Sequence, residues 1–454
     1  MNSNTNRFED ELFIKAANLW NLQKLYTELA HKKTVATNRE IKLTPVEKAC
    51  LRGLLCGYPP KKIAGALHWS CGSLSVQLTK GLYRYVETLT NRTSNTLKSW
   101  RDISIWLEAA GYKTPQQCQD WGEAPQISPF YGRTRELNTL KQWISLKQSQ
   151  LVAILGIVGV GKTSLAAKLA REIQEEFDYI IWRSLSPGQP LKQLLTQLIP
   201  FLSHQPSSEL PEDINLLMSD FIECLREHRC LVILDDAEQI LSGGTLVGQY
   251  KGGYEDYGQL FRRVAQERHQ SCLLLISWEP PLQMELLEKK NYSTRSLTLN
   301  GLPTEDARKL LVANGLSEQE QDIELIKRYR GNPLGLKLAV TTIKDFFFGS
   351  VSEFLSWDDV IVPEPMKTIL IEQLNRLDES EKKVIAYLAR NPNPISIKQL
   401  RYSISLDYNS QLISVLQSLE RRSLMEKISH SNRTFFTTIP IMKTVINEYE
   451  GCLL

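Results

Sequence analysis

A glycine-rich segment near the middle of the chain has the residue types that bind phosphate groups. Residues 156–163 have the sequence GIVGVGKT, which fits G-x-x-x-x-G-K-[ST], follows an apolar strand and opens a helical pattern. Such glycines let backbone N–H groups close around a β-phosphate, while Lys162 neutralises the β and γ oxygens and the Thr163 hydroxyl can bind magnesium. The sequence therefore predicts a P-loop for ATP or ADP. The residues expected at the nucleotide are Gly156, Gly159, Val160, Gly161, Lys162, Thr163 and Ser164.

A second segment ends in two adjacent carboxylates. Residues 230–236 have the sequence CLVILDD, an apolar strand followed by Asp235 and Asp236. Such a pair alone would usually only cap a strand end or a turn, but with a P-loop it is typical of the segment that holds magnesium and activates water. We therefore expect Asp235 and Thr163 to bind Mg²⁺, and Asp236 to be the catalytic residue that polarises the attacking water.

The order of the apolar segments predicts the sheet that positions these residues. From Phe130 onward, short apolar strands alternate with helices, which indicates a multidomain α/β protein whose parallel sheet is covered on both faces. After Gly301 the strands stop and helices continue to about Phe354. The strands are expected at residues 151–155, 179–182, 230–234, 272–276 and 296–299.

The C-terminal part, between Lys367 and Glu448, has the pattern of a winged helix. Helical periodicity is followed by two strand-like runs, and there is no internal repeat. The helices are expected at 380–390, 396–403 and 409–422, and the strands at 424–428 and 434–438.

The N-terminal region combines helical periodicity with positive charge. Residues 41–92 contain eight basic and two acidic residues, a net charge of +6, although the whole chain carries only +3. Lys80 and Arg84 could contact DNA phosphates, but Ser73–Gln77 offers few side chains that read bases, so a protein partner is favoured over DNA. Helices are expected at 8–31, 44–57 with Thr44 as N-cap, 61–67, 73–89 and 97–110, with a helix-turn-helix at about 44–90.

Length and composition narrow the class of protein. A chain of 454 residues suggests about three domains, and 42% hydrophobic with 23% charged residues is typical of globular proteins. Without a C-x-x-C pair or clustered histidines, nucleotide-bound magnesium is the one metal expected. No apolar run reaches roughly 20 residues and no signal peptide is evident, so we expect a cytoplasmic protein without a membrane segment and with reduced cysteines.

Several motifs in a fixed order resemble one family. The sequences FYGR at 130–133, GIVGVGKT, LVILDD, SCLLLISWE and GNPL at 331–334 occur in the order seen in bacterial NB-ARC proteins, STAND-class signalling ATPases related to plant resistance proteins and apoptotic ATPases. The resemblance covers roughly residues 120–440. It implies that Phe130, Tyr131, Gly132 and Arg133 frame the adenine and that Pro333 contacts the nucleotide from a helical domain. The N-terminal region resembles that of members associated with vWA-MoxR systems.

The sequence departs from the family at two positions. Trp278 stands where the family usually has an arginine that senses the γ-phosphate, and TIPIMK at 438–443 lacks the histidine that often contacts ADP. Because such an arginine contributes roughly 10³–10⁵ in rate, we expect slow hydrolysis. Arg262, Arg263 and Arg268 could compensate, although a solvated helix face is the expected place for them.

The resemblance implies a nucleotide-dependent switch in signal transduction or defence that acts through protein partners, with weak ATPase activity. The alternative is a nucleotide-gated transcriptional regulator that binds DNA. Family members commonly append repeats that detect a trigger; we expect the sensor to lie elsewhere, and ATP to promote homo-oligomers. The expected domains are 1–125 (helical), 126–300 (nucleotide-binding), 301–356 (helical, ARC1-like) and 357–454 (winged helix, ARC2-like).

Overall fold

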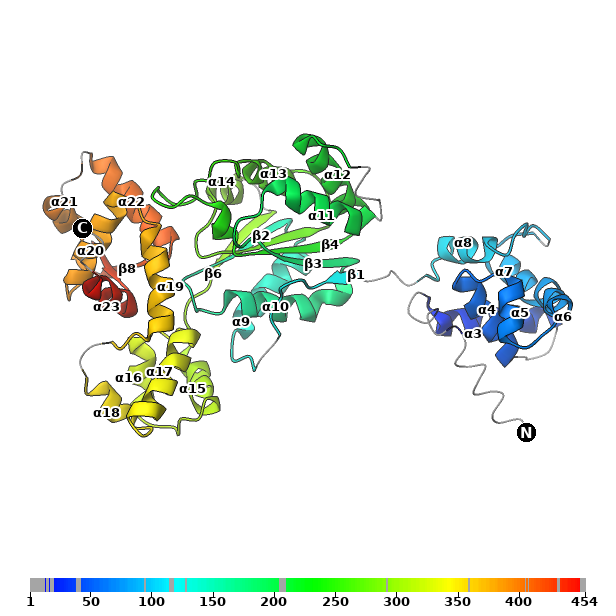
Figure 1. The fold of residues 1–454 in the computed structure, drawn as a ribbon, viewed down its shortest axis with the longest axis horizontal. Coiled ribbons are helices and arrows are strands. Elements are labelled where there is room, and N and C mark those ends of the chain that lie inside the picture. Colours follow the sequence, from blue (N-terminus) through cyan, green and yellow to red (C-terminus); the bar gives the residue numbers. More distant parts are fainter. Residues whose placement is uncertain are drawn as a thin grey trace. The chain divides into compact units, whose positions relative to one another are not determined.

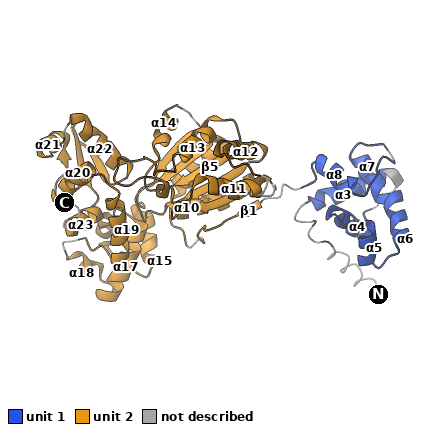
Figure 2. Cartoon of the chain, turned by 45° about the horizontal axis from the view of Figure 1, so that its top comes forward, with its two compact units in different colours: residues 1–116 blue, residues 117–454 orange. Residues whose placement is uncertain are grey.

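The described residues of the computed structural model fall into two units, Met1–Gln116 and Gln117–Leu454 (Figure 1, Figure 2). The division lies before the boundary expected at residue 125, because Cys118–Asp120 (β1) pairs with Tyr179–Ser184 (β3) of the second unit. The structure describes residues 13, 16, 20–37, 42–93, 95–113, 118–126, 129–203, 210–290, 293–357, 360–404, 406, 408–430 and 433–449.

The first unit consists of helices around one core. The expected N-cap is confirmed, since the Thr44 side chain accepts from the Glu47 N–H and the Glu47 carboxylate accepts from the Thr44 N–H. The helix expected at 73–89 extends from Cys71 to Leu89 with a π-helical turn in its middle. Much of the helix expected at 8–31 lies outside the described residues. The helices are α3 (Leu22–Thr37), α4 (Pro45–Leu55), α5 (Pro60–Ala66), α6 (Cys71–Gln77), η1 (Leu78–Leu82), α7 (Tyr83–Leu89) and α8 (Asp102–Ala109).

The second unit begins with a six-stranded parallel sheet, as the strand pattern predicts. The strand order is β1-β3-β4-β5-β2-β6. The short polar strand β1 is the one strand that the sequence pattern does not indicate. In addition to β1 and β3, the strands are β2 (Leu151–Leu155), β4 (Cys230–Asp235), β5 (Cys272–Ile276) and β6 (Thr294–Thr298).

Both faces of this sheet are covered by helices (Figure 1). Alternate residues of β2 enter different cores, with Ala153 on one face and Val152 on the other, because side chains of a strand point alternately up and down. One face packs against α11 (Leu191–Ser203), α12 (Ile214–Glu227), α13 (Asp256–Gln266) and α14 (Leu282–Lys290). The other packs against α9 (Thr134–Lys141) and α10 (Lys162–Ile173).

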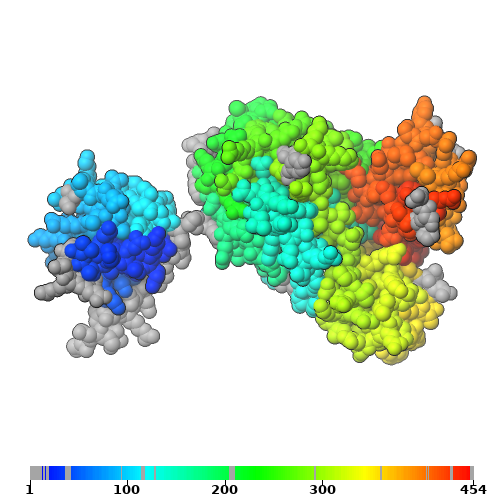
Figure 3. Space-filling view, turned by 180° about the vertical axis from the view of Figure 1, so that it is seen from behind, coloured from blue at the N-terminus to red at the C-terminus, as the bar shows by residue number. Residues whose placement is uncertain are grey.

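After Gly301 the chain forms two groups of helices that share one core from Leu302 to Ile446. In Figure 3 the first group (yellow-green) forms a lobe beside the C-terminal segment (orange to red). The helices are α15 (Thr304–Ala313), α16 (Asp322–Arg328), α17 (Pro333–Phe346), α18 (Val351–Leu355), α19 (Glu364–Asn375), α20 (Glu379–Arg390), α21 (Ile397–Ser403), α22 (Asn409–Arg421) and α23 (Pro440–Glu448).

The three strands near the C-terminus form a small antiparallel sheet in the order β7-β9-β8. These are β7 (Ile395–Ser396), β8 (Met425–His430) and β9 (Arg433–Thr438). The three expected helices and two expected strands lie within about two residues of their predicted ranges, whereas β7 and α23 were not predicted. Across the described residues, no helix is both long and apolar enough to cross a bilayer.

Candidate nucleotide site

The segment Gly156–Thr163 forms a tight loop between β2 and α10. Gly156 has a φ of +141° and Gly159 a φ of +76°. A Cβ on Gly156 would lie 2.5 Å from the carbonyl oxygen of Leu299, and one on Gly159 would lie 2.7 Å from Cβ of Leu334, so neither position has room for a side chain. The loop leads into the first turn of α10, whose unpaired N–H groups attract anions. This is the conformation predicted for a P-loop.

Lys162 is held inside the loop. Its Nζ donates to the carbonyl oxygens of Gly156 at 2.9 Å and of Ile157 at 3.2 Å. Burial lowers the pKa of Lys162, an effect that the nearby Glu238, Asp235 and Asp236 carboxylates oppose. A desolvated ammonium group held against backbone carbonyls is well prepared to exchange them for phosphate oxygens.

Asp235 and Thr163 meet at the end of the sheet, as the magnesium prediction requires. The Thr163 hydroxyl donates to Oδ1 of Asp235 at 3.3 Å. Burial raises the pKa of Asp235 to about 7, and the neighbouring Asp236 and Glu238 carboxylates add to the shift. A buried carboxylate among like charges favours a divalent cation, so the residues present fit Mg²⁺ held by Thr163 and Asp235. Bound there, the ion would neutralise phosphate charge.

This raised pKa predicts a pH dependence of magnesium binding. At pH 6 about nine tenths of the Asp235 carboxyls would carry a proton that must leave before Mg²⁺ binds. We therefore expect the Mg²⁺ affinity of the nucleotide complex to fall by about tenfold between pH 8 and pH 6. Titration of Mg²⁺ at both pH values measures this. Asp235→Asn controls for protonation of the nucleotide, and an equal pH effect in that variant would contradict the assignment.

The raised pKa of Asp235 also makes the stability of the fold depend on pH. The folded-state pKa of Asp235 lies above the usual 3.8, so ionisation is less favourable in the folded protein than in the unfolded chain. Without Mg²⁺, Asp235 therefore destabilises the fold as the pH rises from about 4 to about 7.

Asp236 and Glu238 extend the cluster of carboxylates. Asp236 has a φ of +55°, and its Oδ2 accepts from the Ser184 hydroxyl at 2.7 Å. The buried Glu238 accepts from the Ser277 hydroxyl at 3.0 Å and from the Trp278 N–H at 3.3 Å. The sequence prediction missed Glu238, although an acidic residue two positions after the Asp-Asp pair was a signal for it.

A cavity of about 480 Å³ joins these groups at what would be the phosphate end of a nucleotide site. Trp278 lines it, at the place where the family usually has an arginine. Arg263 instead donates to Glu267 and to Ser219 of α12, and neither Arg262 nor Arg268 lines the cavity. The predicted residues that line it are Gly159, Gly161, Lys162, Thr163, Ser164, Asp235, Asp236 and Pro333.

A second cavity is lined by several of the residues that are predicted to frame the adenine. Gly132, which has a φ of +68° and lies against the Asp306 side chain, is not among the residues that line it. Arg133 lines it and also connects the segment 130–133 to the P-loop, because its Nη2 donates to the carbonyl oxygen of Val160 at 3.0 Å. The predicted residues that line it are Phe130, Tyr131, Arg133, Val160, Gly161, Ser164 and Pro333. The two cavities share Gly161, Ser164, Pro333 and Lys337.

The start of α17 fastens the helical segment to the P-loop. Nδ2 of Asn332 donates to the carbonyl oxygen of Val158 at 3.0 Å, while its Oδ1 accepts from the Gly335 N–H. The Leu334 N–H donates to the carbonyl oxygen of Gly159 at 3.2 Å. These bonds place Pro333 at both cavities. The sequence indicated Pro333 but not Asn332, whose role depends on a partner far away in the sequence.

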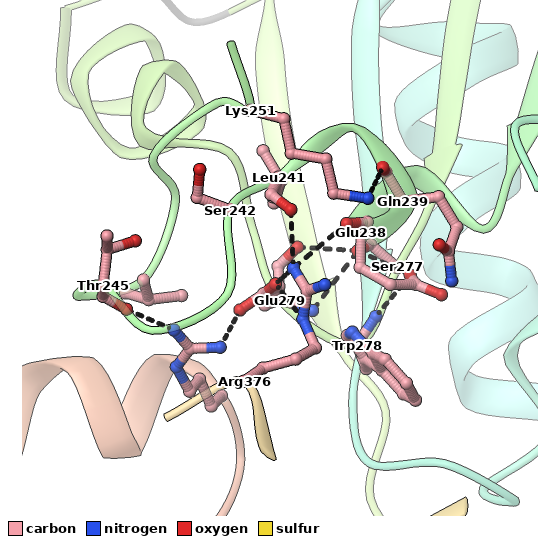
Figure 4. A network of polar contacts seen from close by, with 12 residues as sticks. Glu238, Gln239, Leu241, Ser242, Thr245, Lys251, Ser277, Trp278, Glu279 and Arg376 are labelled. Carbon is pink, nitrogen blue, oxygen red and sulfur yellow. Dashed lines mark hydrogen bonds and ion pairs between the residues drawn. The ribbon is translucent and has the colours of Figure 1, made fainter. Parts of the chain in front are cut away.

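Glu279, directly after Trp278, forms a buried ionic cluster with the C-terminal segment, by which we mean residues 364–449. Nε of Arg376 donates to Oε1 of Glu279 at 2.9 Å, and Nη1 of Arg422 donates to Oε2 of Glu279. Arg422 also pairs with Glu381 at 3.1 Å. Glu279 is 1% exposed. Figure 4 shows Arg376 beside Glu279 and Trp278, and these three residues line a small cavity distinct from the phosphate cavity.

A loop after β4 adds backbone contacts to this cluster. The Gly244 N–H donates to the carbonyl oxygen of Arg376 at 2.9 Å, and the Val247 N–H donates to the Ser418 hydroxyl at 2.8 Å. Nη2 of Arg422 donates to the carbonyl oxygen of Thr245 at 2.8 Å. We call Glu279, Arg376, Arg422 and residues 244–247 the latch.

The segment 438–443, where the family often has a histidine, faces the P-loop across a separate cavity that Ile157 and Val160 also line. No residue of 438–443 lines the phosphate cavity; Thr438 donates to the Leu424 carbonyl oxygen, and Ile439 and Ile441 line a different cavity.

Comparison with known proteins agrees with this site. The NB-ARC domain model matches residues 133–241. A WD repeat-containing protein from Nostoc sp. is 38% identical over 343 residues, which cover 73% of this chain and 27% of that protein. A protein of Arabidopsis thaliana named as an RPP13-like disease resistance protein is 32% identical over 89 residues, or 19% of this chain and 10% of that protein.

Among solved structures, the Walker-type ATPase of Pyrococcus abyssi has a TM-score of 0.49 and 16% identity, covering 72% of this chain and 99% of that one. The chain thus spans about a quarter of the Nostoc relative and a tenth of the Arabidopsis relative. The family match covers the P-loop and the strand that ends in Asp235. Residues 133–241 are therefore similar to an NB-ARC domain.

Proposed function

We propose that the chain is a nucleotide-dependent switch of the NB-ARC/STAND type. The observation that supports this best is the make-up of the phosphate cavity, which is lined by the P-loop, by α17 and, through Ile369 and Glu372, by α19. A ligand that touches three segments can change how they pack. ATP and ADP differ by one charged group at this end, so they can favour different arrangements.

In this proposal, ADP stabilises the arrangement in which the C-terminal segment is closed over the site. Lys162 and the N–H groups of the P-loop hold the β-phosphate, and Thr163 with Asp235 holds Mg²⁺. The latch performs the closing role that a histidine near residues 438–443 has in the family. The elements from α20 to β9 form the proposed winged helix, and α15–α18 the proposed ARC1-like domain.

Hydrolysis is proposed to be slow. Asp236 is the candidate to polarise the attacking water, but no arginine of the described residues lines the phosphate cavity, and Trp278 supplies no charge there. An arginine at the transferred phosphate typically raises the rate by roughly 10³–10⁵. Single-turnover hydrolysis should accordingly be far slower than conformational change.

The trigger and the output are proposed to involve other proteins or modules. The Nostoc relative is named for WD repeats, and the Arabidopsis relative for disease resistance. Repeats of this kind are expected to sense a trigger, and the helix-turn-helix region at about 44–90 is proposed to bind a protein partner.

Size-exclusion chromatography with light scattering tests the switch. With ADP and Mg²⁺ the full chain should elute as a compact monomer. With a non-hydrolysable ATP analogue it should elute earlier or at a larger mass, because freed P-loop surfaces can assemble head to tail. Lys162→Ala should behave identically with both nucleotides. A wild-type monomer of the same elution volume in both states would contradict the proposal.

The DNA-binding alternative is supported by two exposed basic side chains. Lys80 and Arg84 lie four residues apart on the continuous helix Cys71–Leu89. However, other basic residues of this region face aromatic rings, with Nζ of Lys62 4.4 Å from the centre of the Tyr58 ring. If the alternative holds, retention of the full chain on nonspecific DNA should fall steeply with salt and should weaken in Lys80→Ala.

A further inference from the structure

Helix α19 carries two charged residues one turn apart that meet different parts of the molecule. Glu372 lines the phosphate cavity. Arg376 donates to Glu279 and to the carbonyl oxygens of Glu238 at 3.1 Å and of Leu241 at 3.0 Å. Because residues four apart lie on the same helix face, a displacement of α19 at Glu372 would also move Arg376.

Glu372 adds negative charge to the end of the site where the negatively charged phosphate groups of a nucleotide would lie. It does not line the adenine-side cavity. The Glu372 side chain is exposed, and among the described residues its carboxylate forms no hydrogen bond or ion pair. Among the described residues from α18 onward, Glu372 is the charged residue that lines the phosphate cavity. The charged residues that line this cavity are Lys162, Lys337, Asp235, Asp236, Glu238 and Glu372.

We propose that Glu372 is the residue by which the closed form discriminates between nucleoside di- and triphosphates, favouring the diphosphate. This inference rests on the proposed switch function and names the residue that sets its direction. A diphosphate ends at the group that Lys162 and the P-loop hold. The γ-phosphate extends further into a cavity partly walled by the Glu372 carboxylate, and like charges there repel.

Repulsion between Glu372 and the γ-phosphate would displace α19 and thereby weaken the latch. Displacement of this helix would withdraw Arg376 from Glu279, and its carbonyl oxygen from the Gly244 N–H. Next to Glu372, the Gln373 side chain is buried, and its Oε1 accepts no hydrogen bond among the described residues. A buried oxygen without a partner weakens the closed packing, which makes α19 easier to displace.

Equilibrium binding by the full chain tests the inference, using fluorescent ADP and a fluorescent non-hydrolysable ATP analogue at constant Mg²⁺. The ratio of Kd for the ATP analogue to Kd for ADP should fall about five- to tenfold in Glu372→Gln, and further in Glu372→Lys. The matched control is Glu364→Gln, at the start of the same helix, where the carboxylate is 82% exposed and 3.8 Å from Lys367. Its ratio should equal that of the wild type.

Two outcomes would overturn the inference. An unchanged ratio in both Glu372 variants would mean that the carboxylate does not sense the γ-phosphate. A loss of affinity for the ATP analogue in Glu372→Gln would mean that Glu372 helps to hold Mg²⁺ or the nucleotide. Failure of the switch function itself is distinguishable, because the wild-type chain would then elute identically with ADP and with the ATP analogue, whatever the ratio of the two Kd values.

Discussion

Lys162→Ala is expected to lower the affinity of the full chain for ADP by about a hundredfold. The substitution removes the ammonium group that would pair with the β-phosphate, and charge-assisted hydrogen bonds contribute about 1.5–3 kcal/mol. The free energy of unfolding without nucleotide should not fall. Burial lowers the pKa of Lys162, so its charge is unfavourable in the protein without nucleotide. Isothermal titration with ADP, together with a thermal melt without nucleotide, separates binding from folding.

Lys168→Ala is the matched control for this prediction. Lys168 lies on the same helix, and its Nζ is 3.1 Å from Glu172 in a partly exposed ion pair. Such pairs typically contribute about 0–1 kcal/mol, so ADP affinity should stay within a few-fold of the wild type. Equal ADP affinity in Lys162→Ala and wild type would refute the P-loop as the nucleotide site.

Glu279→Gln is expected to open the latch. One carboxylate accepts from both Arg376 and Arg422, and removing one partner of a buried ionic cluster costs about 3–5 kcal/mol. Arg422 keeps its pair with Glu381, whereas the largely buried Arg376 keeps only the backbone carbonyl oxygens of Glu238 and Leu241 among the described residues. The closed arrangement should therefore be at least about a hundredfold less favoured. Amide hydrogen exchange should be much faster at Gly244 and Val247, whose N–H groups bond to the C-terminal segment.

Glu267→Gln provides the comparison for Glu279→Gln. Its carboxylate also accepts from two arginines, Arg226 and Arg263, but at the surface of the nucleotide-binding part and without contact to the C-terminal segment. The expected change is under about 1 kcal/mol, with exchange at Gly244 and Val247 as in the wild type. If Glu279→Gln exchanged as slowly as Glu267→Gln, the ionic cluster would not be what holds the segments together.

The parts of the site that could be predicted are those encoded locally. The P-loop requires glycines at fixed spacing, and buried parallel strands such as β2 and β4 are continuous apolar runs, so both are visible in a short stretch of sequence. Thr44 was identifiable as an N-cap for the same reason, because its partner Glu47 is three residues away.

The parts that could not be predicted depend on partners far apart in the sequence. Glu279 meets Arg422 across 143 positions, and Asn332 meets Val158 across 174. No local pattern distinguishes such an arginine or asparagine from a solvated one. β1 was missed for a different reason. It is three residues long and largely polar, and it forms a strand only because it pairs with β3 at the edge of the sheet.

The strand order of the large sheet has a consequence for how the protein folds during synthesis. β2, which leads into the P-loop, pairs with β5 and β6, whereas β4 reaches β2 only through β5. While the ribosome extends the chain from residue 155 to residue 272, β2 has no partner strand, and its apolar side chains have no sheet to join. A nascent chain that ends at residue 241, the limit of the NB-ARC match, contains β2, β3 and β4 but lacks the strand that joins β2 to the others. Such chains would present unpaired apolar edges to one another and to chaperones, so folding of the P-loop has to wait until β5 emerges.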